Sequence, residues 1–177
     1  TLLNLTFFCI DILGKDVLYV LPNEKPDASD FSSGRFDPAL ELSPYLKNLF
    51  SDVDNMGHKR AGAANLYVRG SRSRSGLKSI PVSRLFMDEV AEFTEANIPL
   101  AFERVSGQLE WLIWLVSTPT IPGFGISKWY DISDKRKFLF ICPSCSKTID
   151  LTFPESMINI DYPDEAKAEI KNLLSIL

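Results

Sequence analysis

The stretch Arg84-Leu85-Phe86-Met87-Asp88-Glu89-Val90 is an apolar run that ends in two adjacent carboxylates. A second apolar run, residues 111–116, ends in the hydroxyl-rich turn Ser117-Thr118-Pro119-Thr120. A buried parallel strand has the first pattern when its tip holds a hydrated Mg²⁺ and a carboxylate that activates water. Because parallel strands end at one edge of a sheet, the two runs predict a shared nucleotide-hydrolysing crevice. The sequence contains no phosphate-cradling Gly-Lys-Ser/Thr loop to complete it.

The composition sets broad limits on function. The chain has 177 residues, 45% of them hydrophobic, and a net charge of −4, which fits one globular core and argues against a polybasic binder. Arg and Lys can still cluster locally on an acidic protein, so a DNA-binding enzyme stays open. No segment reaches the roughly 18 uninterrupted apolar residues of a membrane helix, and the start lacks the features of a signal peptide. We therefore expect no membrane partner.

Apolar strands alternate with amphipathic segments, which predicts an α/β fold with a parallel sheet flanked by helices. The expected strands are residues 17–21, 65–68, 82–87 and 112–116. The expected helices are residues 2–13, 28–42 (bent or interrupted at Gly34 and Pro38), 45–50, a short one within 90–101, 102–109 and 126–132. Phe31, Phe36, Leu40 and Leu42 are the core candidates of the bent helix, and residues 51–64 are expected to form a polar loop.

The pattern changes after Asp134, so we expect a first domain at residues 1–134 and a second at 135–177. In the second, strands at 137–142 and 148–153 should form a hairpin around Cys142-Pro143-Ser144-Cys145, followed by a helix at 163–177. Three cysteines with this spacing fit a reducing compartment and a metal site better than a disulfide framework. The chain opens and closes inside helical patterns, which leads us to expect an internal fragment of a longer protein.

The order of these segments resembles the ATPase domain of the large terminase subunit of tailed phages, and most closely its lambda-type branch. Residues 85–90 resemble the Walker B strand of that family, and residues 116–120 resemble its coupling motif. Residues 67–71 with 77–79 resemble the segment before Walker B, residues 31–38 the segment after the second strand, and residues 142–145 a frequent Cys-Pro-x-Cys hairpin. The resemblance covers residues 1 to about 153.

The resemblance implies a P-loop NTPase-like core with a small Cys-containing hairpin appended, and a motor that uses ATP with Mg²⁺. Asp88 would hold Mg²⁺ and Glu89 would activate water, while Ser117, Thr118 and Pro119 would sense the γ-phosphate. The implied partners are double-stranded DNA, a small terminase subunit, a portal protein and further copies of the same chain, all in the host-cell cytoplasm. The family's phosphate-binding loop would lie just before Thr1, so we expect this polypeptide alone to be inactive.

Cys142 and Cys145 supply half of a tetrahedral zinc site. Two more ligands are needed, and neither Cys9 nor His58 is an obvious partner. The ligands could come from beyond Leu177. A reduced cysteine pair in a hairpin turn explains the motif equally well, so both hypotheses stay open.

The charged candidates also have two interpretations each. Arg35 and Arg104 are candidates for an arginine that stabilises charge on a nucleotide held between subunits, or are ion-pair partners on helix surfaces. A basic segment could contact DNA phosphates or form a solvated loop, and its candidates are Arg69, Arg72, Arg74 and Lys78.

Two rival functions remain at this stage. A helicase or remodelling ATPase also pairs an Asp-Glu strand with a hydroxyl-containing coupling strand. A non-catalytic zinc-hairpin binding module would make the Asp88-Glu89 match accidental. Pro119 after Ser117-Thr118, and the downstream cysteine hairpin, favour the terminase.

Overall fold

The computed structural model describes residues 2–150, apart from the side chains of Val53 and Asp54. The chain divides into two compact units, Thr1–Ile132 and Ser133–Leu177. The division lies beside Asp134, where the sequence pattern changes. Each unit is described by itself below.

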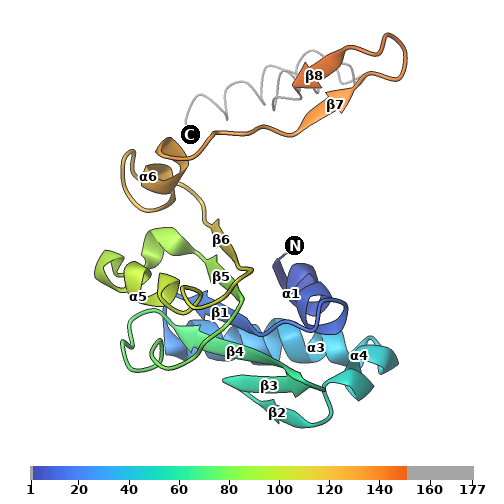
Figure 1. The fold of residues 1–177 in the computed structure, drawn as a ribbon, viewed down its shortest axis with the longest axis vertical. Helices are drawn as coiled ribbons and strands as arrows, with labels where there is room; N and C mark the ends of the chain where they lie inside the picture. Colours follow the sequence, from blue (N-terminus) through green and yellow to red (C-terminus); the bar gives the residue numbers. More distant parts are fainter. Residues whose placement is uncertain (1, 151–177) are drawn as a thin grey trace, which may run out of the picture. The chain divides into compact units, whose positions relative to one another are not determined.

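The first unit is built on a six-stranded sheet with the order β2-β3-β4-β1-β5-β6 (Figure 1). The parallel strands are β4 (Ala64–Gly70), β1 (Val17–Leu21), β5 (Arg84–Asp88) and β6 (Leu112–Val116). These are the four strands expected from the sequence, and their parallel pairing confirms the predicted fold class.

The prediction of a loop at residues 51–64 was wrong. This segment contains β2 (Val53–Asn55) and β3 (His58–Ala61), which pair antiparallel with each other and with β4. Two short turns make the hairpins, and Gly62 adopts the positive φ of +58° that the second turn requires. A charged residue on the buried side hides the strand alternation, because Lys59 is 1% exposed and paired with Asp37 at 2.8 Å.

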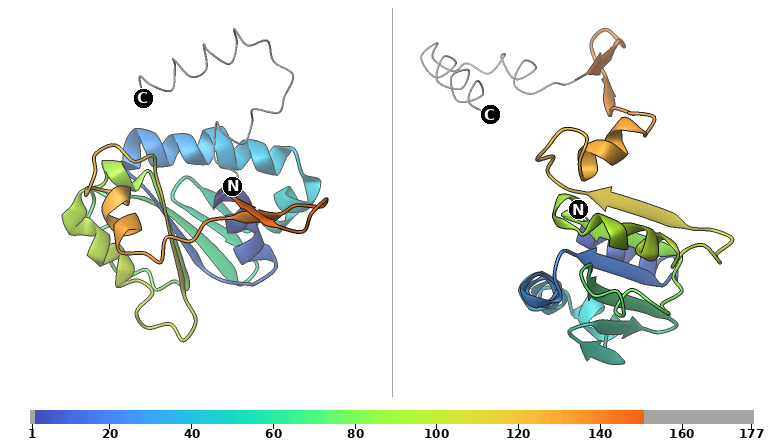
Figure 2. Two further views of the ribbon diagram at one scale, coloured as in Figure 1. Left: turned by 90° about the horizontal axis from the view of Figure 1, so that it is seen from above. Right: turned by 90° about the vertical axis from the view of Figure 1, so that its left-hand side faces the viewer.

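Helices cover both faces of the sheet (Figure 1). One face packs against α1 (Leu2–Asp11), and against a helical run made of η1 (Glu24–Ala28), α2 (Ser29–Phe31), η2 (Ser32–Phe36) and α3 (Asp37–Glu41). The run is followed by α4 (Pro44–Leu49). Figure 2 shows the run as one long helical segment. The expected interruption near Gly34 is a π-helical turn, η2, and not a break.

The opposite face packs against η3 (Val90–Glu92), η4 (Glu95–Asn97) and α5 (Ile98–Phe102). The short helix expected within residues 90–101 is present as α5, but the helix expected at 102–109 was wrong. Pro99 lies in the first turn of α5, where proline is favoured, and residues 103–107 form turns that end at Gly107. A last helix, α6 (Ile126–Asp131), agrees with the sequence expectation.

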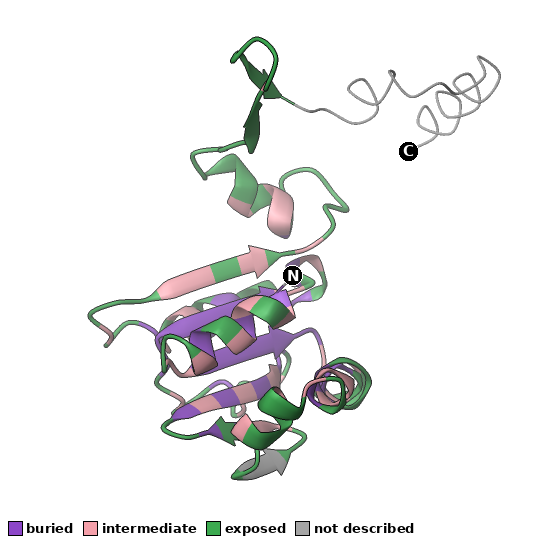
Figure 3. Cartoon of the chain, turned by 90° about the vertical axis from the view of Figure 1, so that its right-hand side faces the viewer, coloured by how far each residue is buried: buried purple, intermediate pink, exposed green. Residues whose placement is uncertain are grey.

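The core lies on either side of the central strand β1, all of whose residues are buried. Figure 3 shows β1 and β5 as buried, whereas β6 at the edge alternates between intermediate and exposed positions. Phe31, Phe36 and Leu40 are in the core as predicted, but Leu42 is 87% exposed because the helix ends before it.

The second unit contains an antiparallel pair, β7 (Leu139–Ile141) and β8 (Thr148–Asp150), with the two cysteines in the turn between them. The expected continuation of the second strand to residue 153 and the helix at 163–177 lie outside the described residues. Within residues 2–150, no helix is long and apolar enough to cross a membrane.

Candidate functional site

The tips of β5 and β6 meet at one edge of the sheet. Asp88 pairs in register with Val116, so Ser117 follows directly beside it. The Ser117 hydroxyl oxygen accepts a hydrogen bond from the backbone N–H of Ala91 at 3.1 Å. This confirms the expectation that Asp88 and Ser117 share the carboxyl edge of the parallel strands.

A side chain of the central strand β1 forms a hydrogen bond with Asp88. The Tyr19 hydroxyl donates a hydrogen bond to Oδ2 of Asp88 at 2.6 Å. Burial, and then the hydrogen bond to Asp88, raise the pKa of Tyr19, so the phenol stays a protonated donor. The bond engages Oδ2 and leaves Oδ1 of Asp88 as the oxygen that can bind another group.

Glu89 begins a sharp change of chain direction. Its backbone is left-handed, with φ 60° and ψ 46°, and the 3-10 turn η3 follows immediately. A non-glycine residue in this region carries a cost on the order of 1–3 kcal/mol, and such residues concentrate at functional sites. The turn leaves the Glu89 side chain exposed at the strand tip, next to Asp88.

A crevice of about 440 Å³ opens beside these two carboxylates. Charged side chains from three separate segments line it. The basic members are Arg35 and Arg72, and the acidic ones are Asp27, Asp30, Asp88, Glu89 and Glu92. A second cavity of about 690 Å³ shares Phe31, Arg35 and Asp88 with it and extends to the first turn of α1 and to Trp114 and Val116 of β6.

Arg72 reaches the crevice because the end of β4 is fastened to the end of β1. The Ser71 backbone N–H donates to the Leu21 carbonyl oxygen at 2.7 Å, and its hydroxyl donates to the Pro22 carbonyl oxygen at 2.9 Å. Gly70 permits this approach, since a Cβ there would overlap the backbone nitrogen of Glu24. From the sequence, Arg72 was interpreted as a DNA contact or as part of a solvated loop, although it follows a strand that ends at the same sheet edge.

Two arginines of the predicted set lie elsewhere. Arg104 is beside the opposite end of β5, where its carbonyl oxygen accepts from the Val82 N–H at 3.1 Å. The Arg69 guanidinium donates to the carbonyl oxygens of Val68, at 2.8 Å, and of Gly57, so it braces the β2–β3 turn.

The guanidinium groups of Arg35 and Arg72 differ from that of Arg69, which bonds to backbone carbonyl oxygens. Among the described residues, neither forms a hydrogen bond or an ion pair. The two arginines can bind the anionic end of a ligand, while the carboxylates that line the same crevice hold a cation or a proton.

The donor set at Asp88 fits Mg²⁺. This ion keeps several waters and needs only one or two protein carboxylates besides phosphate oxygens. Residues 2–150 contain no cluster of three or more His, Cys, Asp or Glu side chains able to hold a metal ion. The half-buried Asp88, with Oδ2 already fixed by Tyr19, can supply one oxygen ligand or accept from a metal-bound water.

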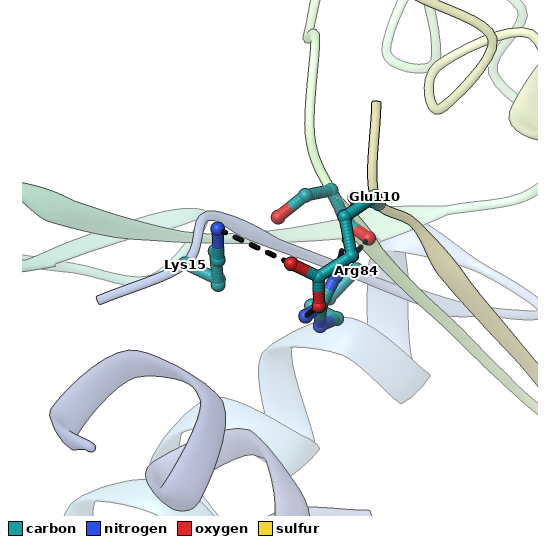
Figure 4. A network of polar contacts seen from close by, with 4 residues as sticks. Lys15, Arg84 and Glu110 are labelled. Atoms are coloured by element: carbon teal, nitrogen blue, oxygen red, sulfur yellow. Dashed lines mark hydrogen bonds and ion pairs between the residues drawn. The ribbon is translucent and has the colours of Figure 1, made fainter. Parts of the chain in front are cut away.

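An ionic network holds the other ends of the same two strands together (Figure 4). Arg84, at the start of β5, pairs with Glu110 at 2.7 Å, and Lys15 lies 3.8 Å from the same carboxylate. The Leu112 N–H donates to the Ser83 carbonyl oxygen at 3.0 Å nearby. The start of β6 is thereby held beside the start of β5, which helps to set the register of Ser117 and Asp88.

The cysteine turn of the second unit is closed by backbone hydrogen bonds. The Ser146 N–H donates to the Cys142 carbonyl oxygen at 2.8 Å. The backbone N–H groups of Cys145 and Ser144 lower the pKa of the Cys142 thiol. Cys9 is buried in the core of the first unit, and Nε2 of His58 contacts Oδ1 of Asn65 at 2.9 Å.

Comparison with solved structures finds the same fold in a phage protein. The large terminase of a thermophilic bacteriophage matches with a TM-score of 0.50 and 15% sequence identity. The match covers 66% of this chain and 29% of that chain, so the chain spans less than a third of the length of the structure it resembles. No curated protein sequence matches.

Comparison with protein families shows which family the chain belongs to. The family model described as phage terminase large subunit gpA, ATPase domain, matches residues 1–173. The match includes both strand tips, the basic segment and the cysteine hairpin. It covers nearly the whole sequence, and the fold and the acidic strand tip agree with it. The chain therefore belongs to the family of the ATPase domain of the phage terminase large subunit gpA.

Proposed function

We propose that the crevice at the carboxyl ends of β1, β4 and β5 binds and hydrolyses ATP with Mg²⁺. The observation that carries the proposal is the meeting of Asp88, Glu89, Arg35 and Arg72 in one cavity, with Ser117 hydrogen-bonded to the same turn. The charges of this group complement a metal–triphosphate, which combines a dication with a polyanion. In the intact protein, this hydrolysis drives double-stranded DNA into a procapsid.

Each charged residue has a distinct task in the proposed reaction. Asp88 holds the metal ion, whose positive charge offsets the charge of the phosphate oxygens. Glu89 accepts a proton from water as the water oxygen bonds to the γ-phosphorus and the bond to the β–γ bridging oxygen breaks. Arg35 and Arg72 contact phosphate oxygens. Since Arg35 and Asp88 line the same cavity, Arg35 acts on the nucleotide of its own subunit.

Ser117, Thr118 and Pro119 form the coupling element. Ser117 touches the turn that Glu89 begins, through the Ala91 N–H. A movement of Glu89 after loss of the γ-phosphate therefore has a direct route to β6 and to the chain that follows it. Such a route relies on a hydrogen bond that is present in one state and altered in the other.

The proposed partners follow the terminase family. They are double-stranded DNA, a small terminase subunit, a portal protein and further copies of the chain in a ring, acting in the host-cell cytoplasm. Arg74 and Lys78 are exposed and are the proposed DNA contacts of the basic segment. Arg69 is engaged by backbone carbonyls, and Arg104 lies at the other sheet edge, so neither contact predicted for them gains support from the geometry.

Family membership decides among the three hypotheses drawn from the sequence. An ATPase-domain family favours a packaging motor over a helicase-type enzyme or a non-catalytic module. The zinc site stays a proposal, because the described cysteine turn offers two thiolates and a closed tetrahedral site needs four ligands.

The test of this function is Glu89→Gln in the full-length protein. The amide keeps the size of the side chain but cannot accept a proton, so ATP turnover should fall by about 10²-fold or more while ATP binding persists. Glu92→Gln is the matched control, since Glu92 lines the same crevice three residues away. Turnover at the wild-type rate in Glu89→Gln would remove Glu89 from its role, and equal losses in both variants would mean a general charge effect.

A further inference from the structure

We infer that Tyr19 is a positioning residue that orients the Asp88 carboxylate for its metal ion. The inference rests on the proposed role of Asp88 and adds a residue that the sequence did not single out. Tyr19 lies in the middle of β1, whereas Asp88 is at the tip of β5. The contact between them spans 69 positions along the chain and measures 2.6 Å.

The Tyr19 ring is fixed before any ligand arrives. It stacks on Phe31, with ring centroids 4.3 Å apart, and meets the edge of Phe86 at 6.5 Å. The side chain is 1% exposed. A ring held on both sides cannot turn freely, so its hydroxyl points at one place, which is Oδ2 of Asp88.

The hydrogen bond from Tyr19 restricts the orientation of the Asp88 carboxylate. A free carboxylate can rotate and offer either oxygen or both to a cation. With Oδ2 bonded to the phenol, the carboxylate keeps one orientation and offers Oδ1 as the oxygen without a hydrogen bond, which suits an ion that demands octahedral geometry and takes single oxygens. Groups that orient metal ligands in this way change metal affinity by about 10–100-fold when they are removed.

A merely structural role would not need the hydroxyl. The ring packs against Phe31 and Phe86, and phenylalanine would keep both of these contacts. What the hydroxyl adds is its bond to Asp88. Removing it therefore separates the two explanations, because the packing stays and only the restraint on the carboxylate is lost.

The experiment compares Tyr19→Phe with Tyr45→Phe in the full-length protein. Tyr45 is a matched control because its hydroxyl also donates to an aspartate, Oδ1 of Asp11, at 2.7 Å on an exposed surface. We expect the Mg²⁺ concentration for half-maximal Mg²⁺-dependent ATP binding to rise about tenfold in Tyr19→Phe and to stay unchanged in Tyr45→Phe. Binding is read from fluorescence of a labelled ATP analogue, so no turnover is required.

Asp88→Asn separates this inference from the proposed function. If Asp88→Asn raises the Mg²⁺ requirement and Tyr19→Phe does not, the positioning role is wrong and the site survives. If Asp88→Asn leaves the requirement unchanged, both the site and the positioning role are overturned.

A second measurement requires no change at Tyr19 and covers the case in which Tyr19→Phe fails to fold. Adding Mg²⁺ and ATP to Tyr45→Phe should shift the tyrosine absorption band, because a cation at Asp88 weakens the hydrogen bond from the phenol. The shift should be absent when Asp88 is also changed to Asn. A spectrum that does not respond to Mg²⁺ in Tyr45→Phe would overturn the inference.

Discussion

The Ser117 hydroxyl accepts a hydrogen bond from the Ala91 backbone N–H at 3.1 Å, which joins the tip of β6 to the turn that Glu89 begins. Ala91 is two residues beyond Glu89, and Ser117 is the first residue after β6. The predicted coupling motif therefore touches the predicted catalytic turn directly. A change in the conformation of either segment alters this hydrogen bond.

Ser117→Ala should uncouple ATP hydrolysis from DNA movement. The alanine removes the acceptor for the Ala91 N–H, while Glu89 and Asp88 stay in place. We expect ATP affinity to stay within about twofold of wild type, with a larger loss in DNA packaged per ATP hydrolysed than in hydrolysis itself. Thr94→Ala is the control, because Thr94 is also a hydroxyl residue, is exposed, and lies outside the coupling element. Equal packaging yields per ATP in wild type and Ser117→Ala would contradict the coupling role.

Arg72→Ala should weaken ATP binding, whereas Arg74→Ala should weaken DNA binding. Arg72 lines the crevice with Asp88 and Glu89, so its loss should weaken ATP binding, on the order of tenfold for a charge-assisted contact to phosphate. Arg74 is exposed on the same segment, and its loss should weaken DNA binding and reduce the salt dependence of that binding. Nucleotide titration and DNA titration at several salt concentrations measure the two effects. If Arg72→Ala altered only DNA binding, Arg72 would return to the role expected from the sequence.

Gly125→Ala should destabilise the fold more than Gly123→Ala. Both glycines have positive φ, 53° and 74°, so an alanine at either one costs about 1 kcal/mol of backbone strain. A Cβ at Gly125 would also lie 2.8 Å from the Ala91 Cα, whereas nothing lies within 4 Å of one at Gly123. The extra crowding should add roughly 1–3 kcal/mol and displace the Glu89 turn.

Denaturant unfolding of both variants checks the stability difference, and ATP turnover checks the displacement of the turn. Equal free energies of unfolding for the two variants would show that the loop after β6 does not pack on Ala91.

The ion pair between Arg84 and Glu110 predicts a dependence of stability on pH. The hydrogen bond and charge of Arg84, and then the charge of Lys15, hold the pKa of Glu110 below its ordinary value of 4.5. A carboxyl group with a lowered pKa stabilises the folded state fully above its ordinary pKa, and the contribution is lost as pH falls through the lowered value. Glu110→Gln should therefore be less stable than wild type near pH 7, and the difference should shrink below pH 4.5.

Thermal unfolding across this pH range measures the effect. Glu41→Gln is a suitable control, because Glu41 is an exposed helix residue that forms no ion pair within the described part of the chain, and the substitution removes the same charge. A stability difference for Glu110→Gln that persisted undiminished in acid would rule out the ion pair as its source.

Zinc binding at Cys142 and Cys145 should depend on ligands from outside the described residues. Two thiolates leave half of a tetrahedral site to water, so this chain alone should retain little zinc after dialysis. A longer chain that continues past Leu177 should retain about one zinc ion if further ligands follow, and Cys145→Ser should abolish it. Tight stoichiometric zinc in the chain alone would mean that it contains all four ligands.

The parallel core was predictable because its signals are local. Residues 17–21 and 84–88 are largely apolar runs, as expected for strands buried on both faces. The polar hairpin at 53–61 was missed because the contact that buries it involves a residue distant in sequence. Lys59 points inward and is neutralised by Asp37, which is distant in sequence, so no local pattern shows that the strand is buried.

From its sequence alone, this protein was determined to have a parallel α/β core with Asp88, Glu89 and Ser117 at one edge, because strand patterns are local and parallel strands end together. Only the tertiary structure decided which other side chains join them. It brought Tyr19 and Arg72 to Asp88 and left Arg104 at the far end of β5. Such meetings depend on strand order, on register and on the close approach at Gly70, which arise from packing between distant segments.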